Sequence, residues 1–184
     1  MTGWRSALRR ARPAAAPPPG DPALAADLAA RLDATARVRL GRGLALRHVD
    51  GGGCGGCALQ LAMLRDTAGA LERLGLRFVA SPRHADVLLC AGPLTRSMRE
   101  AVERAYAAMP DPRWVVALGD CAVDGGVFRG SYAVEGGFDA AVPVDLVIRG
   151  CPPTPGQILA GLSALLAANA TKPTRAPGAD GALG

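Results

Sequence analysis

The apolar positions between residues 44 and 168 form two alternating kinds of segment. Short apolar runs, which have the length and the Val/Leu/Ile content of β-strands, occur at 44–49, 77–80, 86–91, 114–118 and 144–148. Longer segments with apolar residues at helical spacing occur at 57–74, 95–109 and 154–168. Such alternation is typical of an α/β fold, a mostly parallel sheet flanked by helices. The uninterrupted apolar run at 86–91 predicts a strand buried on both faces.

The helix ends and the flanking segments define the expected domain. Thr95 and Thr154 are predicted to cap the second and third helices, and a Gly-rich loop is predicted over 119–137. Residues 1–20 contain four arginines and three consecutive prolines and predict a basic, disordered arm, and 171–184 predict a disordered tail. Leu24, Leu28 and Leu32 predict a short helix before the core. The folded domain is therefore expected to span 21–170, and 184 residues fit one domain.

Composition and charge limit the partners and the cellular location that we expect for this chain. The chain has 21 Lys+Arg and 16 Asp+Glu, a net charge of +5, but only Lys172 is a lysine. We interpret this arginine bias as a mark of a GC-rich genome and expect no nucleic-acid partner. The stretch from Cys151 to Thr171 contains three prolines and is too short to span a bilayer, which takes about 20 apolar residues. We expect a cytoplasmic chain, whose reduced cysteines favour a metal or redox role.

Four of the five cysteines each follow a predicted strand. Cys54 and Cys57 come after the first strand, Cys121 after the fourth and Cys151 after the fifth. Ligands of open α/β sheets bind at the carboxyl ends of the strands, so these four cysteines are expected to meet at that edge. Cys90 lies inside the third strand, where a buried cysteine acts as a small hydrophobe.

The four-cysteine set suits two kinds of metal group. Four thiolates are the ligand number of a [4Fe-4S] cluster, but they also suit zinc. The glycines at 51–53, 55 and 56 would let backbone approach a bulky cluster closely and direct N–H groups at its sulfurs. These glycines favour the cluster, although ligand count alone leaves zinc open.

Other motifs in the chain carry weaker signals. Gly51, Gly53 and Gly56 match a dinucleotide-binding fingerprint, but the expected acid is missing where the second strand runs into Ser81, Pro82 and Arg83. We therefore expect no dinucleotide there. His48 and His84 have no triad-type motif around them, and structural roles are expected for both, with His84 capping a turn before the third strand.

Several segments in order along residues 44–168 resemble one known family. The resemblance rests on Asp50-Gly-Gly-Gly-Cys-Gly-Gly-Cys57, Ser81 to Leu89, Gly92 to Thr95, Met109 to Arg113, Gly119 to Ala122, Gly130 to Tyr132, Pro143 to Asp145 and Gly150 to Thr154. They resemble the 20 kDa iron–sulfur subunit of NADH:quinone oxidoreductase. That subunit has two adjacent cysteines at the first position, so Cys54-Gly-Gly-Cys57 is more similar to the small subunit of membrane-bound, energy-converting nickel–iron hydrogenases and formate hydrogenlyases.

This resemblance implies a flavodoxin-like domain that holds one [4Fe-4S] cluster through Cys54, Cys57, Cys121 and Cys151. It implies an electron-transfer subunit, with no activity alone, of a membrane-associated hydrogenase-like or NADH:quinone oxidoreductase-like complex. The implied partners are a large catalytic subunit of the hydrogenase or 49 kDa type, a ferredoxin-like iron–sulfur subunit and membrane subunits. The implied location is peripheral, on the inner face of the cell membrane.

One residue departs from the hydrogenase-like pattern, which has an acid where this chain has Gln60. Its side chain is expected to point towards the cluster edge. Glutamine cannot ionise, so electron transfer is expected without a proton step through residue 60. The alternative interpretation, from a different class, is a stand-alone α/β binding module with a structural four-cysteine zinc site.

Overall fold

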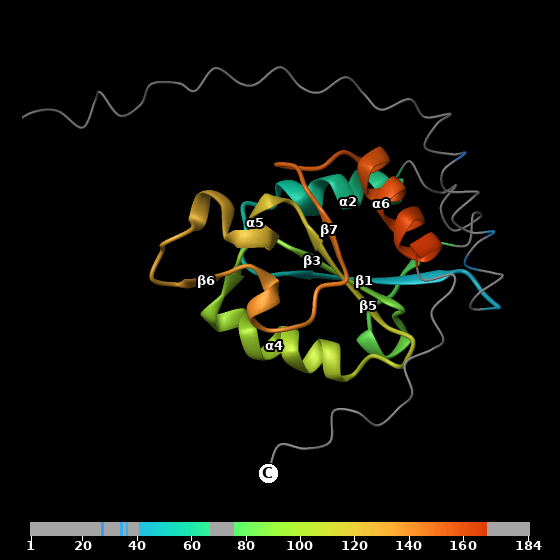
Figure 1. The fold of residues 1–184 in the computed structure, drawn as a ribbon, viewed down its shortest axis with the longest axis horizontal. Helices are drawn as coiled ribbons and strands as arrows, with labels where there is room; N and C mark the ends of the chain where they lie inside the picture. Colours follow the sequence, from blue (N-terminus) through green and yellow to red (C-terminus); the bar gives the residue numbers. More distant parts are fainter. Residues whose placement is uncertain (1–26, 28–33, 35, 37–40, 67–75, 169–184) are drawn as a thin grey trace, which may run out of the picture.

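The computed structural model describes residues 27, 34, 36, 41–66 and 76–168, which form a five-stranded sheet with helices on both faces (Figure 1). The strands are β1 (Leu44–Asp50), β2 (Leu76–Phe78), β3 (Val87–Ala91), β5 (Trp114–Leu118) and β7 (Leu146–Ile148). Their order is β2-β1-β3-β5-β7, and every neighbouring pair is parallel. The predicted α/β fold is confirmed, and each predicted strand is present with ends shifted by at most two residues.

Alternate residues of the strands supply two separate cores. Helices α2 (Gly56–Asp66) and α6 (Pro155–Ala168) cover one face, and α4 (Arg96–Ala107) covers the other (Figure 1). Leu44 and Leu46 belong to the core that includes residues of α2 and α6, whereas Leu88 and Cys90 belong to the core that includes α4. Because successive side chains of a strand point to opposite faces, one apolar run fills both cores. Cys90 is fully buried, as predicted.

The two predicted threonine caps have different outcomes. Thr154 and Gln157 form a reciprocal capping box, in which the Thr154 hydroxyl accepts from the Gln157 N–H at 3.3 Å and Gln157 Oε1 accepts from the Thr154 N–H at 2.8 Å. Thr95 stands at the N-cap of α4 but makes no capping bond. Its hydroxyl instead donates to the Gly51 carbonyl oxygen at 2.6 Å, so its role is to hold the loop after β1.

The prediction of a Gly-rich loop throughout 119–137 is wrong, because the segment contains helical turns and a strand. This segment contains α5 (Asp120–Asp124), a 3-10 turn η3 (Gly126–Phe128) and β6 (Val134–Gly136), and another 3-10 turn, η4 (Phe138–Ala140), follows. Strand β6 pairs antiparallel with β4 (Leu94–Thr95), a partner far away in the sequence. These elements are short and depend on tertiary pairing, which a glycine-rich sequence does not reveal.

Some sequence predictions fall outside the described residues. These predictions are the basic arm, the tail, the helix around Leu24 and the continuation of the 57–74 helix beyond residue 66. The domain bounds of 21–170 therefore stay a prediction.

In the described ranges, no helix is both long enough and apolar enough to cross a bilayer. The turn η2 (Pro82–His84) precedes β3 as expected, but its cap is the Ser81 hydroxyl, which accepts from the Arg83 N–H, and not His84.

The strand order fixes where a ligand can bind. After β1 the chain forms β2 on one side of it, and the later strands then add on the other side, so the order reverses between β1 and β3. This order is the flavodoxin-like one, in which ligands bind at the switch point beside the carboxyl ends of the strands. The loops after β1, β3, β5 and β7 therefore gather at one edge.

The opposite edge of the sheet is fastened by a buried carboxylate. Asp86 is only 2% exposed and accepts from the Ala45 N–H at 2.8 Å. It also accepts from both terminal nitrogens of Arg42, at 3.0 and 2.7 Å. Asp86 thereby joins the start of β1 to the start of β3.

We predict that Asp86→Ala lowers the free energy of unfolding by about 2–3 kcal/mol, because the buried Ala45 N–H loses a charged acceptor. Urea denaturation followed by circular dichroism measures this change. The matched control is Glu100→Ala, which removes the exposed ion pair with Arg104 and should cost less than about 0.5 kcal/mol. Equal losses in the two variants would contradict the assignment.

Candidate metal centre

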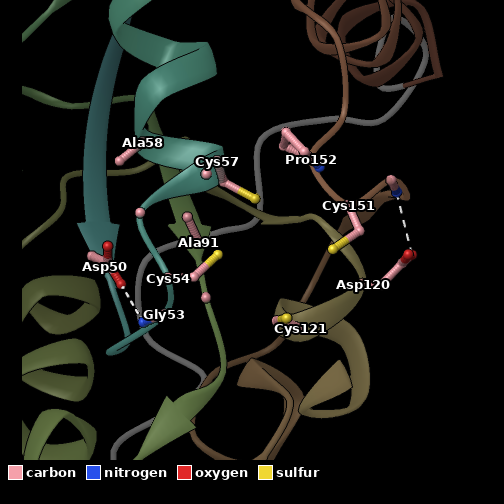
Figure 2. Close-up of a pocket in the computed structure, with 14 residues that line it drawn as sticks. Asp50, Gly53, Cys54, Cys57, Ala58, Ala91, Asp120, Cys121, Cys151 and Pro152 are labelled. Atoms are coloured by element: carbon pink, nitrogen blue, oxygen red, sulfur yellow. Dashed lines mark hydrogen bonds between the residues drawn. The ribbon is translucent and has the colours of Figure 1, made fainter. Parts of the chain in front are cut away.

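Four cysteines from three loops line one cavity of about 130 Å³ at the carboxyl edge of the sheet. Figure 2 shows their sulfur atoms pointing towards a common space. Cys57 is the second residue of α2, Cys54 lies in the loop before it, Cys121 belongs to α5, and Cys151 follows β7. Cys121 is buried and Cys57 half-buried, whereas Cys54 and Cys151 are exposed. The structure thus brings together the four cysteines that the sequence singled out, at a site that opens to solvent.

Glycines next to two sulfurs leave no room for a side chain. Gly119 has a φ of +87°, and a Cβ there would lie 2.7 Å from Cys57 Sγ. Gly126 has a φ of +50°, and a Cβ there would lie 2.7 Å from Cys121 Sγ. Both positions therefore need glycine for its backbone conformation and for the space that it leaves to the sulfur.

The loop that bears Cys54 is fastened to the end of β3 and to β4. The Gly51 N–H donates to the Ala91 carbonyl at 2.8 Å. The Gly51 carbonyl in turn accepts from both the N–H and the hydroxyl of Thr95, at 3.1 and 2.6 Å. These bonds hold the glycine segment against the switch point.

The four thiols influence one another electrostatically. Burial raises the pKa of Cys57 to about 11, and negative charge on Cys121, Cys54 and Cys151 contributes to the rise, in that order. Burial also raises the pKa of Cys121, although the Val127 N–H, which bonds to this cysteine, acts in the opposite direction. Thiolates must form when a metal binds, so metal uptake by this site must release protons.

The four cysteines are the candidate metal ligands among the described residues. Among the described residues, no three or more His, Cys, Asp or Glu side chains are placed to hold one metal ion. The four cysteines nevertheless line one cavity. Four cysteines can supply the ligands of a [4Fe-4S] cluster or of a zinc ion.

Gln60 and His48 are not among the described residues that line the cavity. Gln60 is half-buried in α2 and is not among the described residues that line the cavity, so the expected orientation of its side chain towards the cluster edge stays a prediction. His48 is absent from the lining as well, and its Nε2 is buried without a hydrogen-bond partner in the described part of the chain. Burial chiefly lowers the pKa of His48.

Sequence reasoning gave no role to two carboxylates that line the cavity, Asp50 and Asp120. Asp50 ends β1 just before the glycine run, and Asp120 directly precedes Cys121. Adjacency to the cysteine motifs is the only signal that the sequence offers for them.

A flavodoxin-like parallel sheet with four cysteines at its switch point defines a thiolate-lined α/β domain. The chain belongs to the family of the 20 kDa subunit of NADH:ubiquinone oxidoreductase, whose sequence profile matches residues 54–165. The family suggested by the sequence motifs is therefore confirmed, and with it a place among the subunits of oxidoreductases.

Individual relatives come from two kinds of enzyme. Formate hydrogenlyase subunit 7 of Escherichia coli (strain K12) is 41% identical over 137 residues, 74% of this chain and 54% of that one. The B subunit of NADH-quinone oxidoreductase from Geobacter metallireducens is 45% identical over 106 residues, 58% of this chain and 62% of that one. The chain thus spans less than two thirds of either relative.

A solved structure has the same fold. It is a chain from the membrane-bound sulfane sulfur reductase, an archaeal respiratory membrane complex. The TM-score is 0.60 and the identity 27%, over 75% of this chain and 74% of that one.

Gly119→Ala should abolish most metal binding, because its Cβ would displace Cys57 Sγ. Gly130→Ala is the matched control, since Gly130 has a similar φ of +81° but nothing within 4 Å of a Cβ. Both variants should lose about 1–2 kcal/mol of stability through the left-handed backbone. The iron and zinc content per chain, measured after anaerobic metal loading, should be low in Gly119→Ala and unchanged in Gly130→Ala. Equal metal content in the two variants would refute the role given to Gly119.

Proposed function

We propose that Cys54, Cys57, Cys121 and Cys151 hold one [4Fe-4S] cluster and that the chain is an electron-transfer subunit of an oxidoreductase complex. The observation that carries this proposal is the convergence of four cysteine side chains on one cavity at the switch point. The glycines beside two of the sulfurs, which leave room for a bulky group, support a cluster over a single zinc ion. Bound there, such a cluster supplies a reversible one-electron step.

The protein's own contribution is to shape and tune the site. Gly119 and Gly126 leave space beside two of the sulfurs. The Val127 N–H bonds to Cys121, and a bond of this kind to a ligand sulfur affects the potential of a bound cluster. No general acid is assigned, and Gln60 offers no ionisable group, so no proton step passes through residue 60.

The complex that we propose is membrane-associated and either hydrogenase-like or NADH:quinone oxidoreductase-like. The names of the relatives support both possibilities. The chain would sit peripherally on the inner face of the cell membrane, between a large catalytic subunit and a ferredoxin-like subunit.

Two exposed apolar residues lie close in the chain to Cys57 and Cys121. Leu59, two residues after Cys57, is 61% exposed, and Val127, bonded to Cys121 through its N–H, is 80% exposed. We place both side chains in the interface that a large subunit would cover. A partner here would bring its own redox centre close to the four cysteines.

Replacing any one of the four cysteines by serine should remove at least half of the bound iron, whereas Cys90→Ser should leave it in place, because Cys90 is buried in the α4-facing core. Anaerobic iron and sulfide assays with electron paramagnetic resonance on the reduced chain provide the measurement. A colourless wild-type chain with one zinc, or iron loss confined to Cys90→Ser, would refute the cluster.

Affinity purification of the full chain from gently solubilised membranes should recover a large catalytic subunit. Val127→Asp and Leu59→Asp should reduce that recovery at least fivefold, because each places a charge in the proposed interface. Ala101→Asp, an exposed change on α4, is the matched control. The interface assignment fails if the control lowers recovery as much as the other two.

A further inference from the structure

Two carboxylates contact the backbone directly beside the cysteines. Asp50 Oδ1 accepts from the Gly52 N–H at 2.8 Å and from the Gly53 N–H at 3.0 Å. Gly53 is the residue immediately before Cys54 and is packed tightly, since a Cβ on Gly92 would lie 2.7 Å from the Gly53 nitrogen. The approach of the chain to Cys54 is therefore fixed to the end of β1.

Asp120 makes a reciprocal contact between two loops. Its Oδ1 accepts from the Gly150 N–H at 3.2 Å, and its own N–H donates to the Gly150 carbonyl at 3.0 Å. Asp120 directly precedes Cys121, and Gly150 directly precedes Cys151. This pair thus joins two cysteine-bearing loops that lie thirty residues apart in the sequence. Figure 2 shows both carboxylate contacts at the rim of the cavity.

We propose that Asp50 and Asp120 are positioning residues of the four-cysteine centre, which hold the backbone before Cys54, Cys121 and Cys151 in place through their acceptor oxygens. This inference rests on the proposed function. Fixing a residue's backbone costs about 1–2 kcal/mol, so loops that are ordered in advance bind a metal group more tightly.

We assign the positioning role to the acceptor oxygen of each side chain; Asp120 Oδ1 also forms an ion pair with Arg149 Nη1 at 3.7 Å. A negative charge beside thiolates opposes their ionisation, and Asp50 indeed acts on the pKa of Cys57 in that direction. Asparagine retains the oxygen without the charge, whereas alanine removes both. The two substitutions therefore separate a positioning role from an electrostatic one.

The test compares Asp50→Ala, Asp50→Asn, Asp120→Ala and Asp120→Asn in the full chain. Asp145→Ala is the matched control, because Asp145 Oδ2 also accepts from a backbone N–H, that of Val115 at 2.8 Å, but at the opposite edge of the sheet. The first measurement is amide hydrogen exchange in the metal-free chain. Exchange in peptides covering 51–54 should become about tenfold faster in Asp50→Ala, and exchange in peptides covering 149–151 should become about tenfold faster in Asp120→Ala. The corresponding asparagine variants should change these rates less than twofold.

The second measurement is iron release to a chelator after anaerobic loading with iron and sulfide. Both alanine variants should release iron about tenfold faster than the wild type, and the asparagine variants should stay within twofold. Wild-type rates in the alanine variants, equal acceleration by asparagine, or equal acceleration by Asp145→Ala would overturn the inference. If the wild type takes up no cluster, the proposed function fails, and the hydrogen-exchange arm decides the inference alone.

Discussion

Parallel pairing in register is the constraint on which the site depends. The last residues of four strands form one row, since Asp50 pairs with Ala91, Ala91 with Leu118, and Leu118 with Ile148. The loops bearing Cys54, Cys121 and Cys151 all begin within a few residues of this row. Parallel strands end at the same edge, so backbone hydrogen bonds far from any sulfur determine how closely the cysteines approach.

The elements that the sequence predicts best are those whose own residues determine them. β5 has the predicted ends of Trp114 and Leu118, because an apolar run that is buried on both faces stops where polar or glycine residues begin. β6 was missed, because three residues around Glu135 form a strand only through pairing with Leu94 and Thr95. Thr95 is the N-cap residue of α4 as predicted, but its hydroxyl makes no capping bond, because it donates to the distant Gly51 carbonyl instead.

Within the site, too, residues placed by local sequence could be predicted, and residues placed by tertiary pairing could not. The four cysteines could be predicted, because their spacing and the strands before them place them at one edge. Asp120 could not, because its partner Gly150 is distant in sequence and becomes a neighbour only when β7 pairs with β5. Gln60 is close to Cys57 in the sequence but is not among the described residues that line the cavity, and its predicted orientation towards the cluster edge stays a prediction.

The packing of the domain indicates whether the fold needs a bound metal group for its stability. Neither buried core includes any of the four cysteines, although Cys57 packs against the edge of one. Structural zinc sites supply folding energy to chains with little core of their own. Here two apolar cores and the Asp86 contacts hold the sheet independently of the sulfurs. A group bound at this edge is thus better explained by its chemistry than by a need to stabilise the fold, which favours a redox cofactor over a structural ion.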